Sequence, residues 1–319
     1  MKKISIVLPC YNEEDNIKPL YERLQAITQT LKAYAFEFVF IDNCSQDQTA
    51  VLLKALAHEN PQVKVILNAR NFGHIRSPYY AMMQAEGDAV ILMATDLQDP
   101  PEMIIEFIKK WEEGFKVVAA IKPVSQESRI MFKIRKLYYS LVARISEAKL
   151  IHNFTGFGLY DQRVIAMLRT LEDPYPYLRG LVSELGFKVA EVPFNQPRRL
   201  RGITKNNFYT LYDIAMLGIT SHSKVPLRLA TICGFFLSGV SMLIAVIYLI
   251  LKLIFWKQFA LGIAPVLIGV FFFFSVQLFF IGLLGEYIMA IHTQVMKRPL
   301  VVEEERLNFD KDLPKGNGG

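Results

Sequence analysis

Residues 91–102 read ILMATDLQDPPE, a short apolar run followed at once by an acidic turn and two prolines. The run predicts a strand over Ala89–Met93, and Asp96 and Asp99 then place carboxylates just after its end. In open α/β folds, ligands bind at the carboxyl ends of the strands. Carboxylate oxygens suit Mg²⁺ or Mn²⁺ held jointly with substrate phosphates. Alone, the motif fits a solvated acidic loop better, but the rest of the chain favours a ligand site.

Strand-like and helix-like segments alternate through residues 1–122. Strands are expected at Ile4–Leu8, Phe36–Ile41, Val63–Leu67, Ala89–Met93 and Lys116–Ala120. Helices are expected along the Leu20–Leu31 stripe and over Asp47–His58, Ile75–Ala85 and Glu102–Glu113. Because the strands are almost continuously apolar, this alternation predicts an α/β fold with a parallel sheet that helices cover on both faces.

Two further loops follow predicted strands and carry polar side chains. In the first, Tyr11 could stack on a base while Asn12 and Glu13 hydrogen-bond base or ribose. The alternative is an ordinary helix entry, where acidic residues favour the positive end of the helix dipole. In the second, Asp42 ends a hydrophobic strand, and Ser45 or Asp47 is expected to cap the next helix. With the Asp96 loop, these segments predict a nucleotide site.

The C-terminal third of the 319-residue chain carries two long uncharged runs, at residues 229–251 and 259–285. The shorter run spans roughly 35 Å as a helix, enough to cross a hydrocarbon core of about 30 Å. The short connection over residues 252–258 predicts an antiparallel transmembrane hairpin, so both flanking parts lie on one side of the lipid bilayer. The domains expected are a catalytic part (1–225), the hairpin (226–291) and a C-terminal tail (292–319).

Charge and cysteine content indicate on which side of the bilayer the catalytic part lies. The basic residues near the hairpin are Lys224, Arg228, Lys297 and Arg298 on its flanks and Lys252 and Lys257 in its loop. This modest bias, with no recognisable signal peptide, predicts a multi-pass protein of the cytoplasmic membrane with its catalytic part and both termini in the cytoplasm. The three cysteines lack metal-ligand spacing and are expected to be free thiols.

A basic-rimmed amphipathic pattern covers residues 129–149. It predicts an interfacial helix over about 128–149, with its apolar face toward the membrane. Packing against the protein core is the alternative. A second interfacial helix is expected at about 206–221, and Asp310–Gly319 has the composition of a disordered tail.

Four segments taken together, VLPCYNEEDNI, IDNCSQDQT, RNFGH and DLQDPPE, resemble the inverting family 2 glycosyltransferases with a GT-A (Rossmann-like) fold. The closer similarity is to the polyprenyl-phosphate glycosyltransferases, the group that includes dolichol-phosphate mannose synthase and bactoprenol glucosyltransferases. The similarity continues through LRGLVSELGF (178–187), RRLRGITK (198–205) and GEYI (285–288), and so covers nearly the whole chain.

The resemblance implies roles for residues at matching positions. The nucleotide sugar would be bound by Pro9, Tyr11, Asn12, Glu13, Asp42, Asn43, Asp96, Arg199 and Lys205. Asp96 and Gln98 would contact a Mg²⁺ or Mn²⁺ cofactor and the donor diphosphate. Arg199 and Lys205 match a basic loop that closes over the donor site. We interpret His74 as a loop residue near the donor.

Three departures from the family pattern stand out. Ala94 replaces the first carboxylate of an Asp-x-Asp motif, and Asn43 replaces the second aspartate of an Asp-Asp pair. Thr155-Gly156-Phe157-Gly158 stands where Gly-Asp-Phe-Arg is usual. The loss at position 94 weakens the expectation of tight metal binding more than the expectation of activity.

The acceptor implied by the resemblance is a polyprenyl phosphate, whose second pKa of about 6 makes it mostly anionic at pH 7. A strong general base is therefore unnecessary, and electrostatic stabilisation carries the reaction. Lys122, Arg129 and Arg135 are expected to bind the acceptor phosphate, with Asp96, Arg129 and Arg135 as the catalytic residues. The alternative is that these basic residues attract anionic lipid in general.

The expected function is the inverting transfer of one sugar, from a nucleotide diphosphate sugar (UDP-linked) to undecaprenyl phosphate, for modification of cell-envelope glycans. A homo-oligomer is expected, and no nucleic acid partner. A processive polysaccharide synthase is the enzymatic alternative, although the chain lacks a QxxRW-like motif. A catalytically silent membrane scaffold, supported by Ala94 and Gly156, is the alternative of another class.

Overall fold

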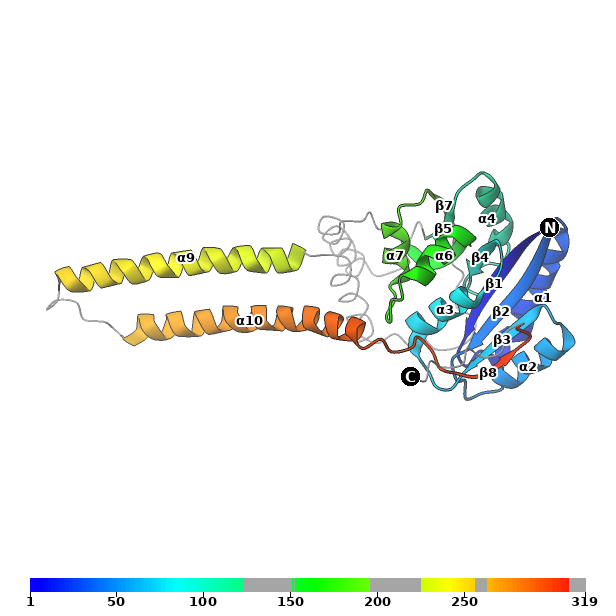
Figure 1. Ribbon diagram of the computed structural model, residues 1–319, viewed down its shortest axis with the longest axis horizontal. Coiled ribbons are helices and arrows are strands. Elements are labelled where there is room, and N and C mark those ends of the chain that lie inside the picture. The colour runs from blue at the N-terminus through cyan, green and yellow to red at the C-terminus, as the bar shows by residue number, and fades with distance from the viewer. Residues whose placement is uncertain (123–150, 152, 196–224, 256–262, 310–319) are drawn as a thin grey trace.

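Strand–helix alternation builds the N-terminal part of the protein, as the sequence predicts. The computed structural model describes residues 1–122, 151, 153–195, 225–255 and 263–309 (Figure 1). The first strands and helices are β1 (Lys2–Cys10), α1 (Glu14–Thr30), β2 (Tyr34–Asp42), α2 (Thr49–Glu59), β3 (Val63–Asn68), α3 (Gly73–Gln84), β4 (Ala89–Leu92), α4 (Met103–Glu112) and β5 (Val117–Ile121). Each element expected before residue 123 is confirmed to within a few residues of its bounds.

The sheet is mixed rather than wholly parallel. Its order is β7-β5-β6-β4-β1-β2-β3-β8, and β4, β1, β2 and β3 run parallel to one another. The antiparallel strand β6 (Phe154–Asp161) lies between β4 and β5. Because β6 is antiparallel to both β4 and β5, all five predicted strands run in the same direction, but β6 interrupts the wholly parallel sheet that the sequence predicts.

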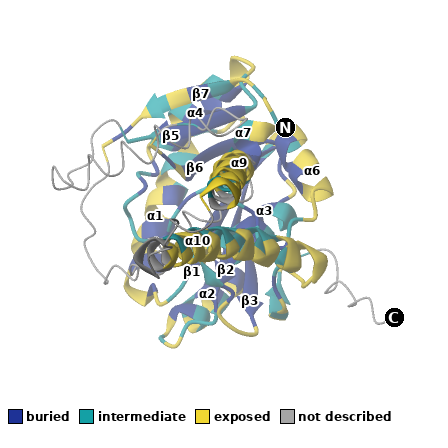
Figure 2. Ribbon diagram, turned by 90° about the vertical axis from the view of Figure 1, so that its left-hand side faces the viewer, coloured by how far each residue is buried: buried dark blue, intermediate teal, exposed yellow. Residues whose placement is uncertain are grey.

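Helices cover both faces of this sheet, because the side chains of each strand alternate between two apolar cores. Ile6 and Leu8 of β1 pack with α1, α2 and α4, whereas Val7 packs on the opposite face with α3, α6 (Gln162–Thr170) and α7 (Leu178–Glu184). Full burial of each such side chain contributes roughly 1.5–3 kcal/mol. Figure 2 shows the buried strands between the partly exposed helices.

Five elements of the sheet domain were not predicted. Besides β6, α6 and α7, they are β7 (Val189–Pro193) and β8 (Glu303–Leu307). The strand β8 comes from the expected C-terminal tail and pairs antiparallel with β3 at the sheet edge. Its sequence, EEERL, carries four charges in five residues, so it has no apolar strand signal. An ion pair of 2.5 Å between Lys54 and Glu305 holds it against α2.

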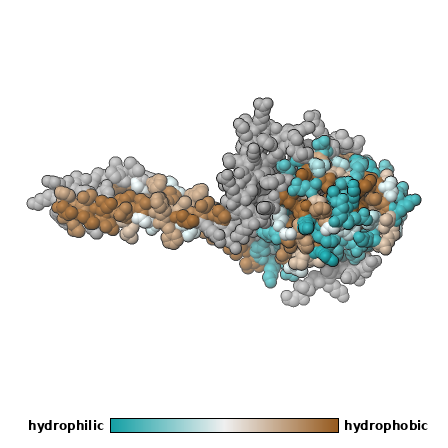
Figure 3. All heavy atoms as spheres, turned by 90° about the horizontal axis from the view of Figure 1, so that it is seen from above, coloured by the Kyte–Doolittle hydropathy of each residue, from teal (hydrophilic) through white to brown (hydrophobic). Residues whose placement is uncertain are grey.

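Two long helices project from one side of the sheet domain, α9 (Val225–Ile254) and α10 (Ile263–Val295), and run in opposite directions (Figure 1). Many of their apolar side chains are exposed, such as Phe235 (77%) and Leu278 (67%). Figure 3 shows an apolar rod attached to a largely hydrophilic globular part. Within the described residues, one helical stretch, Phe272–Val295, is long and apolar enough to cross a membrane, and Leu229–Ile244 is a shorter apolar stretch.

The second uncharged run was expected at residues 259–285, but the candidate span lies later in the chain. The helix continues past Glu286 to Val295, so a single acidic residue does not end it. The expected interfacial helices (about 128–149 and 206–221) and the tail after residue 309 lie outside the described residues.

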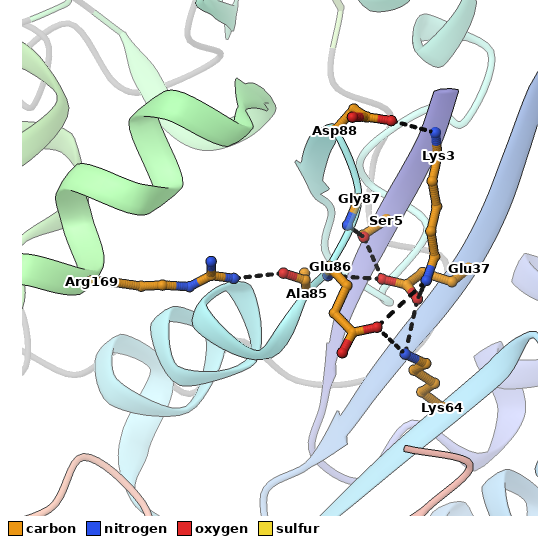
Figure 4. Close-up of polar contacts among 9 residues, drawn as sticks. All are labelled: Lys3, Ser5, Glu37, Lys64, Ala85, Glu86, Gly87, Asp88 and Arg169. Carbon is orange, nitrogen blue, oxygen red and sulfur yellow. Dashed lines mark hydrogen bonds and ion pairs between the residues drawn. The ribbon is translucent and has the colours of Figure 1, made fainter. Parts of the chain in front are cut away.

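A buried polar cluster lies at the opposite edge of the sheet from the strand carboxyl ends (Figure 4). The Glu37 carboxylate accepts hydrogen bonds from the Ser5 hydroxyl (2.5 Å) and the Glu86 amide (3.0 Å). It also pairs with Lys3 at 2.5 Å and with Lys64 at 3.1 Å. Both Glu37 and Lys64 are buried. The cluster thereby joins β1, β2 and β3 to the end of α3.

The cluster holds Glu37 in its charged form. Burial acts to raise the pKa of Glu37, but hydrogen bonds from Lys3, Ser5 and the Glu86 amide and the charge of Lys64 outweigh burial and lower it. Because the folded pKa lies below the ordinary value of 4.5, the stabilisation is present above about pH 4.5 and is lost as the pH falls through the folded value.

Glu37→Ala is expected to lower the free energy of unfolding by about 3 kcal/mol or more, since it leaves buried Lys64 without its buried carboxylate. The apparent Tm of the full chain in neutral detergent should fall by roughly 10 °C, and its loss of stability below about pH 4.5 should become shallower. Glu59→Ala removes an exposed carboxylate of α2 and should shift Tm by about 1 °C at most. Equal shifts in the two variants would contradict the role given to Glu37.

Candidate functional site

A cleft of about 390 Å³ opens at the carboxyl ends of β1, β2, β3 and β4. Its lining is contributed by the loops after these strands and by the first turns of α3: Pro9, Cys10, Tyr11, Glu13, Asn43, Asn71, Gly73, His74, Ser77, Pro78, Ala94, Thr95 and Asp96. The structure thus brings together five predicted site residues, Pro9, Tyr11, Glu13, Asn43 and Asp96, which are far apart in the sequence. The volume lies in the range of small-ligand sites.

Three of the residues predicted to contact the nucleotide sugar or the metal are not among those lining the cleft: Asn12, Asp42 and Gln98. The Asp42 carboxylate is buried and accepts hydrogen bonds from the amide (3.0 Å) and the hydroxyl of Ser45. Burial, the largest effect, raises the pKa of Asp42 even though the Ser45 hydrogen bonds oppose it. In this geometry Asp42 supports the loop that follows β2.

The loop after β1 and the loop after β2 are joined by reciprocal hydrogen bonds. The Asn12 amide donates to the Ser45 hydroxyl (2.8 Å), and the Gln46 amide donates to Asn12 Oδ1 (2.8 Å). The Asp47 carboxylate accepts from the amide of Thr49 (3.0 Å), but the N-cap residue of α2 is Gln48, so the cap expected at Ser45 or Asp47 is wrong. Asn12 and Cys44 both have positive φ angles, so each loop turns sharply just beyond its strand.

Asn43 connects the ends of β2 and β3. Its Nδ2 donates to Asn71 Oδ1 (2.8 Å) and to the Gly73 carbonyl (3.3 Å). Its Oδ1 accepts from Asn68 Nδ2 (3.0 Å) and from the Phe72 amide (2.8 Å). An asparagine offers both donors and acceptors, whereas an ionised aspartate only accepts. The departure from Asp-Asp therefore has a structural reason in this chain.

The Asp96 loop is held from within. Asp96 is half-buried, and its Oδ1 accepts a hydrogen bond from the Gln98 amide (3.1 Å). The buried Asp99 carboxylate accepts from the Ala94 amide (2.9 Å), and Leu97 adopts a positive φ of 60°. Burial, reinforced by the charge of Asp96, raises the pKa of Asp99 to about 6. Asp99 therefore organises the loop, while Asp96 faces the cleft.

Only a shared metal site fits these residues. No group of three or more His, Cys, Asp or Glu side chains that could hold a metal ion occurs in the described parts of the chain. Asp96 lines the cleft, Ala94 adds no second carboxylate, and Gln98 is absent from the lining. One carboxylate with substrate phosphates and water is a common environment for Mg²⁺. Asp96 fits an ion held jointly with a diphosphate, not one held by protein alone.

A smaller hollow of about 130 Å³ adjoins the cleft across His74 and Pro78. Its lining includes Gly156, Tyr177 and Arg179. The Arg179 guanidinium donates to the Phe154 carbonyl (3.1 Å), which aims a half-buried cation at this space. Sequence reasoning quoted the segment around Arg179 but assigned it no role, because an isolated arginine in a helical pattern carries no signal of its own.

His74 belongs to the first turn of α3, not to a loop as the sequence analysis expected. The RNFGH motif reads as a turn, but Gly73, at φ 86°, already begins the helix. Burial by the cleft wall is the larger cause that lowers the pKa of His74, and the charge of Arg179 is the second. The neutral ring is therefore favoured where the cleft meets the smaller hollow.

Gly158 shows why the usual arginine is missing near position 156. A Cβ atom at position 158 would lie 2.2 Å from the Val118 carbonyl oxygen, so no side chain fits there. Phe157 packs edge-on against Phe107, with ring centroids 5.0 Å apart, and Gly156 has a φ of 102°. Here β6 thus contributes close backbone packing in place of a polar side chain.

Of the three predicted acceptor-phosphate residues, Lys122 is in the described part of the chain. Lys122 is half-buried beyond the end of β5, and its charge acts on Asp99 in the Asp96 loop. Arg129, Arg135, Arg199 and Lys205 lie outside the described residues.

Comparison with known proteins identifies the family. The family model described as Glycosyl transferase family 2 matches residues 5–168, which include all four strands and every loop of the cleft. The chain belongs to glycosyl transferase family 2. Its mixed sheet, with the cleft at the carboxyl ends of the parallel strands, is the GT-A-like fold that the sequence analysis expected.

Several family 2 relatives match over most of their length. The bactoprenol glucosyl transferase of Shigella phage SfII is 36% identical over 298 residues, covering 93% of this chain and 96% of that protein. The uncharacterized glycosyltransferase YkcC of Bacillus subtilis is 34% identical and covers 96% of this chain and 94% of its own. Among solved structures, glucosyl-3-phosphoglycerate synthase from Mycobacterium tuberculosis with UDP is 17% identical, with a TM-score of 0.47, over 69% of this chain and 78% of that one.

Asn43→Asp is expected to weaken nucleotide binding about tenfold in this family 2 enzyme. The new carboxylate would face Asn71 Oδ1 and the Gly73 carbonyl, so two hydrogen bonds become repulsive contacts and the wall formed by residues 71–74 loosens. Binding of UDP to the full chain checks this. Asn60→Asp, at the end of α2 and away from the cleft, is the control and should change affinity by about twofold at most. Unchanged UDP affinity in Asn43→Asp would contradict the role assigned to Asn43.

Proposed function

We propose that this glycosyltransferase transfers one sugar from a nucleotide diphosphate sugar, UDP-linked, to a polyprenyl phosphate, with undecaprenyl phosphate as the acceptor. The single observation that supports this best is the cleft that gathers Tyr11, Glu13 and Asp96 within a family 2 chain whose relatives of 34–36% identity include bactoprenol glucosyl transferases. The lipid-linked sugar would then serve the modification of cell-envelope glycans.

The lining of the cleft suggests how the donor lies. Tyr11 can stack on the base, and the Glu13 carboxylate can accept hydrogen bonds from base or ribose. The loop after β2, supported by Asp42 and Asn12, closes that end. Asp96, in the loop after β4, would then face the diphosphate. The sugar would point toward His74 and the smaller hollow. Arg199 and Lys205 are proposed to cover the donor once it is bound.

The reaction balances without a general base. An oxygen of the acceptor phosphate attacks the anomeric carbon as the bond from that carbon to the diphosphate oxygen breaks, so configuration inverts and a nucleoside diphosphate leaves. No proton needs removal, because the acceptor is already an anion at pH 7. The protein's task is to orient two anions in line and to stabilise the developing negative charge.

Asp96 would hold a divalent cation, Mg²⁺ or Mn²⁺, against the donor diphosphate, with Gln98 proposed to assist. When bound, such a cation offsets the charge of the leaving diphosphate. Lys122, Arg129 and Arg135 are proposed to bind the acceptor phosphate, since arginine can grip two phosphate oxygens with its planar group. The charge of Lys122 acts on Asp99 in the Asp96 loop, so Lys122 is close enough to that loop to bind the acceptor phosphate beside the donor.

We further propose that α9 and α10 form a transmembrane hairpin, with the sheet domain and both termini in the cytoplasm. Support comes from their lengths of 30 and 33 residues, their opposite directions and their exposed apolar side chains. The return of the chain into β8 after α10 places the end of that helix on the side of the sheet domain.

Incubating the purified full chain with Mn²⁺, undecaprenyl phosphate and a panel of nucleotide sugars tests the proposed function. A lipid carrying one sugar, formed from a UDP-linked donor, is expected. A polymeric product would favour a processive synthase. No turnover with any donor, despite UDP binding, would favour a silent scaffold.

Asp96→Ala is expected to lower transfer at least about 100-fold, the scale of losing one electrostatic stabiliser of a transition state. Asp99→Asn is the matched control, because an amide oxygen can still accept the hydrogen bond from the Ala94 amide; it should retain activity within roughly tenfold. Initial rates at saturating Mn²⁺ check both. Near-normal turnover of Asp96→Ala would rule out its proposed role.

The hairpin predicts which positions face the outside of the cell. In a chain whose native cysteines are replaced, Lys257→Cys should react with a membrane-impermeant maleimide in intact cells. Glu59→Cys, exposed on α2, should react only after the cells are opened. Labelling of both positions from one side would contradict the hairpin.

A further inference from the structure

A further cavity, of about 330 Å³, lies across the loop after β3 from the donor cleft. It is lined by Ala69, Arg70, Phe72, Arg76, Arg298, Pro299 and Val302. None of these residues lines the donor cleft, whose share of the same loop is Asn71, Gly73, His74 and Ser77. The segment from residue 69 to residue 77 therefore forms a wall between two separate spaces, and we refer to the second as the arginine pocket.

Two of the arginines, exposed Arg70 and half-buried Arg76, contact the ring of Phe72 and nearby carbonyl groups. The guanidinium carbons of Arg70 and Arg76 lie 4.1 and 5.5 Å from the ring centroid of buried Phe72. Arg70 donates to the Asn71 carbonyl (3.2 Å), and Arg76 donates to the Pro299 carbonyl. Holding arginine side chains in this way removes the entropy cost of ordering them when a ligand binds.

The positive charges of the pocket are not balanced by its own walls. Three of its seven lining residues are arginines and none is acidic. The Nε atom of Arg76 is buried and has no hydrogen-bond partner in the described part of the chain. Partial burial and the charges of Arg70 and Arg298 lower the pKa of Arg76, although Tyr175 opposes them. Such a cluster is suited to an anion.

The pocket lies where the chain leaves the candidate membrane span. Arg298 follows Val295, the last residue of both α10 and that span, by three positions. Val295 and Met296, at the helix end, are exposed at 72% and 40%. Figure 1 shows this end of α10 against the side of the sheet domain from which the helices project. Phosphates of anionic lipids collect at this depth, just outside the hydrocarbon core.

We propose that the arginine pocket binds the phosphate of an anionic phospholipid headgroup. The planar arginine groups supply paired donors to the phosphate oxygens, and Phe72, Pro299 and Val302 give the pocket an apolar wall for the glycerol end. A membrane lipid is favoured over a free phosphate ion by the three-residue separation from the span. The inference rests on the proposed membrane insertion of α10, but not on which sugar or acceptor the enzyme uses.

Because the two spaces share a wall, binding in the arginine pocket is expected to affect the donor cleft. Asn71, Gly73 and His74 face the donor cleft from the same loop whose Arg70 and Phe72 face the arginine pocket. A phosphate that holds Arg70 and Arg76 together would steady that loop. Occupancy of the pocket is therefore expected to favour nucleotide binding two- to threefold, a modest coupling between the membrane and the active site.

The test measures binding of short-chain, soluble phosphatidylglycerol to the full chain in neutral detergent. Short-chain phosphatidylcholine and inorganic phosphate are the comparison ligands. Saturable binding of phosphatidylglycerol is expected, at least about tenfold tighter than either. Arg298→Gln should weaken it about tenfold, the loss of one charged hydrogen bond, and Arg70→Gln should do the same.

Lys297→Gln is the matched control, since it removes the same charge one residue away and does not line the pocket. It should change phosphatidylglycerol affinity by about twofold at most, and UDP should still bind all three variants. Equal binding of phosphatidylcholine and phosphatidylglycerol would overturn the proposal. So would equal losses in Arg298→Gln and Lys297→Gln. Inorganic phosphate binding as tightly as phosphatidylglycerol would assign the pocket to a free anion instead.

Discussion

The parallel pairing of β1 with β2 is the constraint on which the site depends. Their register runs without interruption from Lys2 opposite Tyr34 to Cys10 opposite Asp42, so both strands end at the same level. The following loops are consequently forced together, and their polar groups must find partners where water is excluded. The backbone amide of Asn43 donates to the Cys10 carbonyl (2.9 Å), and the Thr95 hydroxyl donates to the Pro9 carbonyl (2.9 Å). The cleft is the space left between loops bound in this way.

The departures from the family pattern acquire a meaning in this context. Asn43 lines the cleft but uses its side-chain amide group to bind the β3–α3 loop, which an ionised aspartate could not do. Gly158 lets β6 approach β5 so closely that no side chain fits. The first change exchanges a carboxylate for side-chain hydrogen bonds, and the second exchanges an arginine for tighter packing of backbone. The charged side chains that line the cleft and the adjoining hollow include Asp96 and Arg179.

How much of this could be predicted from the sequence depended on the kind of signal each segment carries. The first five strands are apolar runs such as Ile4–Leu8, so their order and the edge that carries Tyr11 and Asp96 followed directly. By contrast, β8 is almost wholly charged, because it lies at a sheet edge where its side chains reach solvent or ion pairs. The pairing of Asn43 with Asn71 required the fold, because it joins loops that follow different strands. The convergence of Arg70 and Arg76 with Arg298 also required it, since no spacing rule relates residues more than 200 positions apart.

The strand β8 also ties the candidate membrane span to the sheet domain that carries the cleft. Only residues 296–302 separate the end of α10 from a strand hydrogen-bonded to β3. Within that connection, the Ala69 amide donates to the Val302 carbonyl (3.0 Å), Arg76 donates to Pro299, and Val301 is buried. A flexible linker of this length would let the domain rotate freely over the membrane. A connection bonded along its course instead fixes the end of α10 against the loop that walls the donor cleft. The proposed delivery of a lipid-borne acceptor would require such a fixed orientation, because the acceptor phosphate could leave the membrane surface only by a short distance.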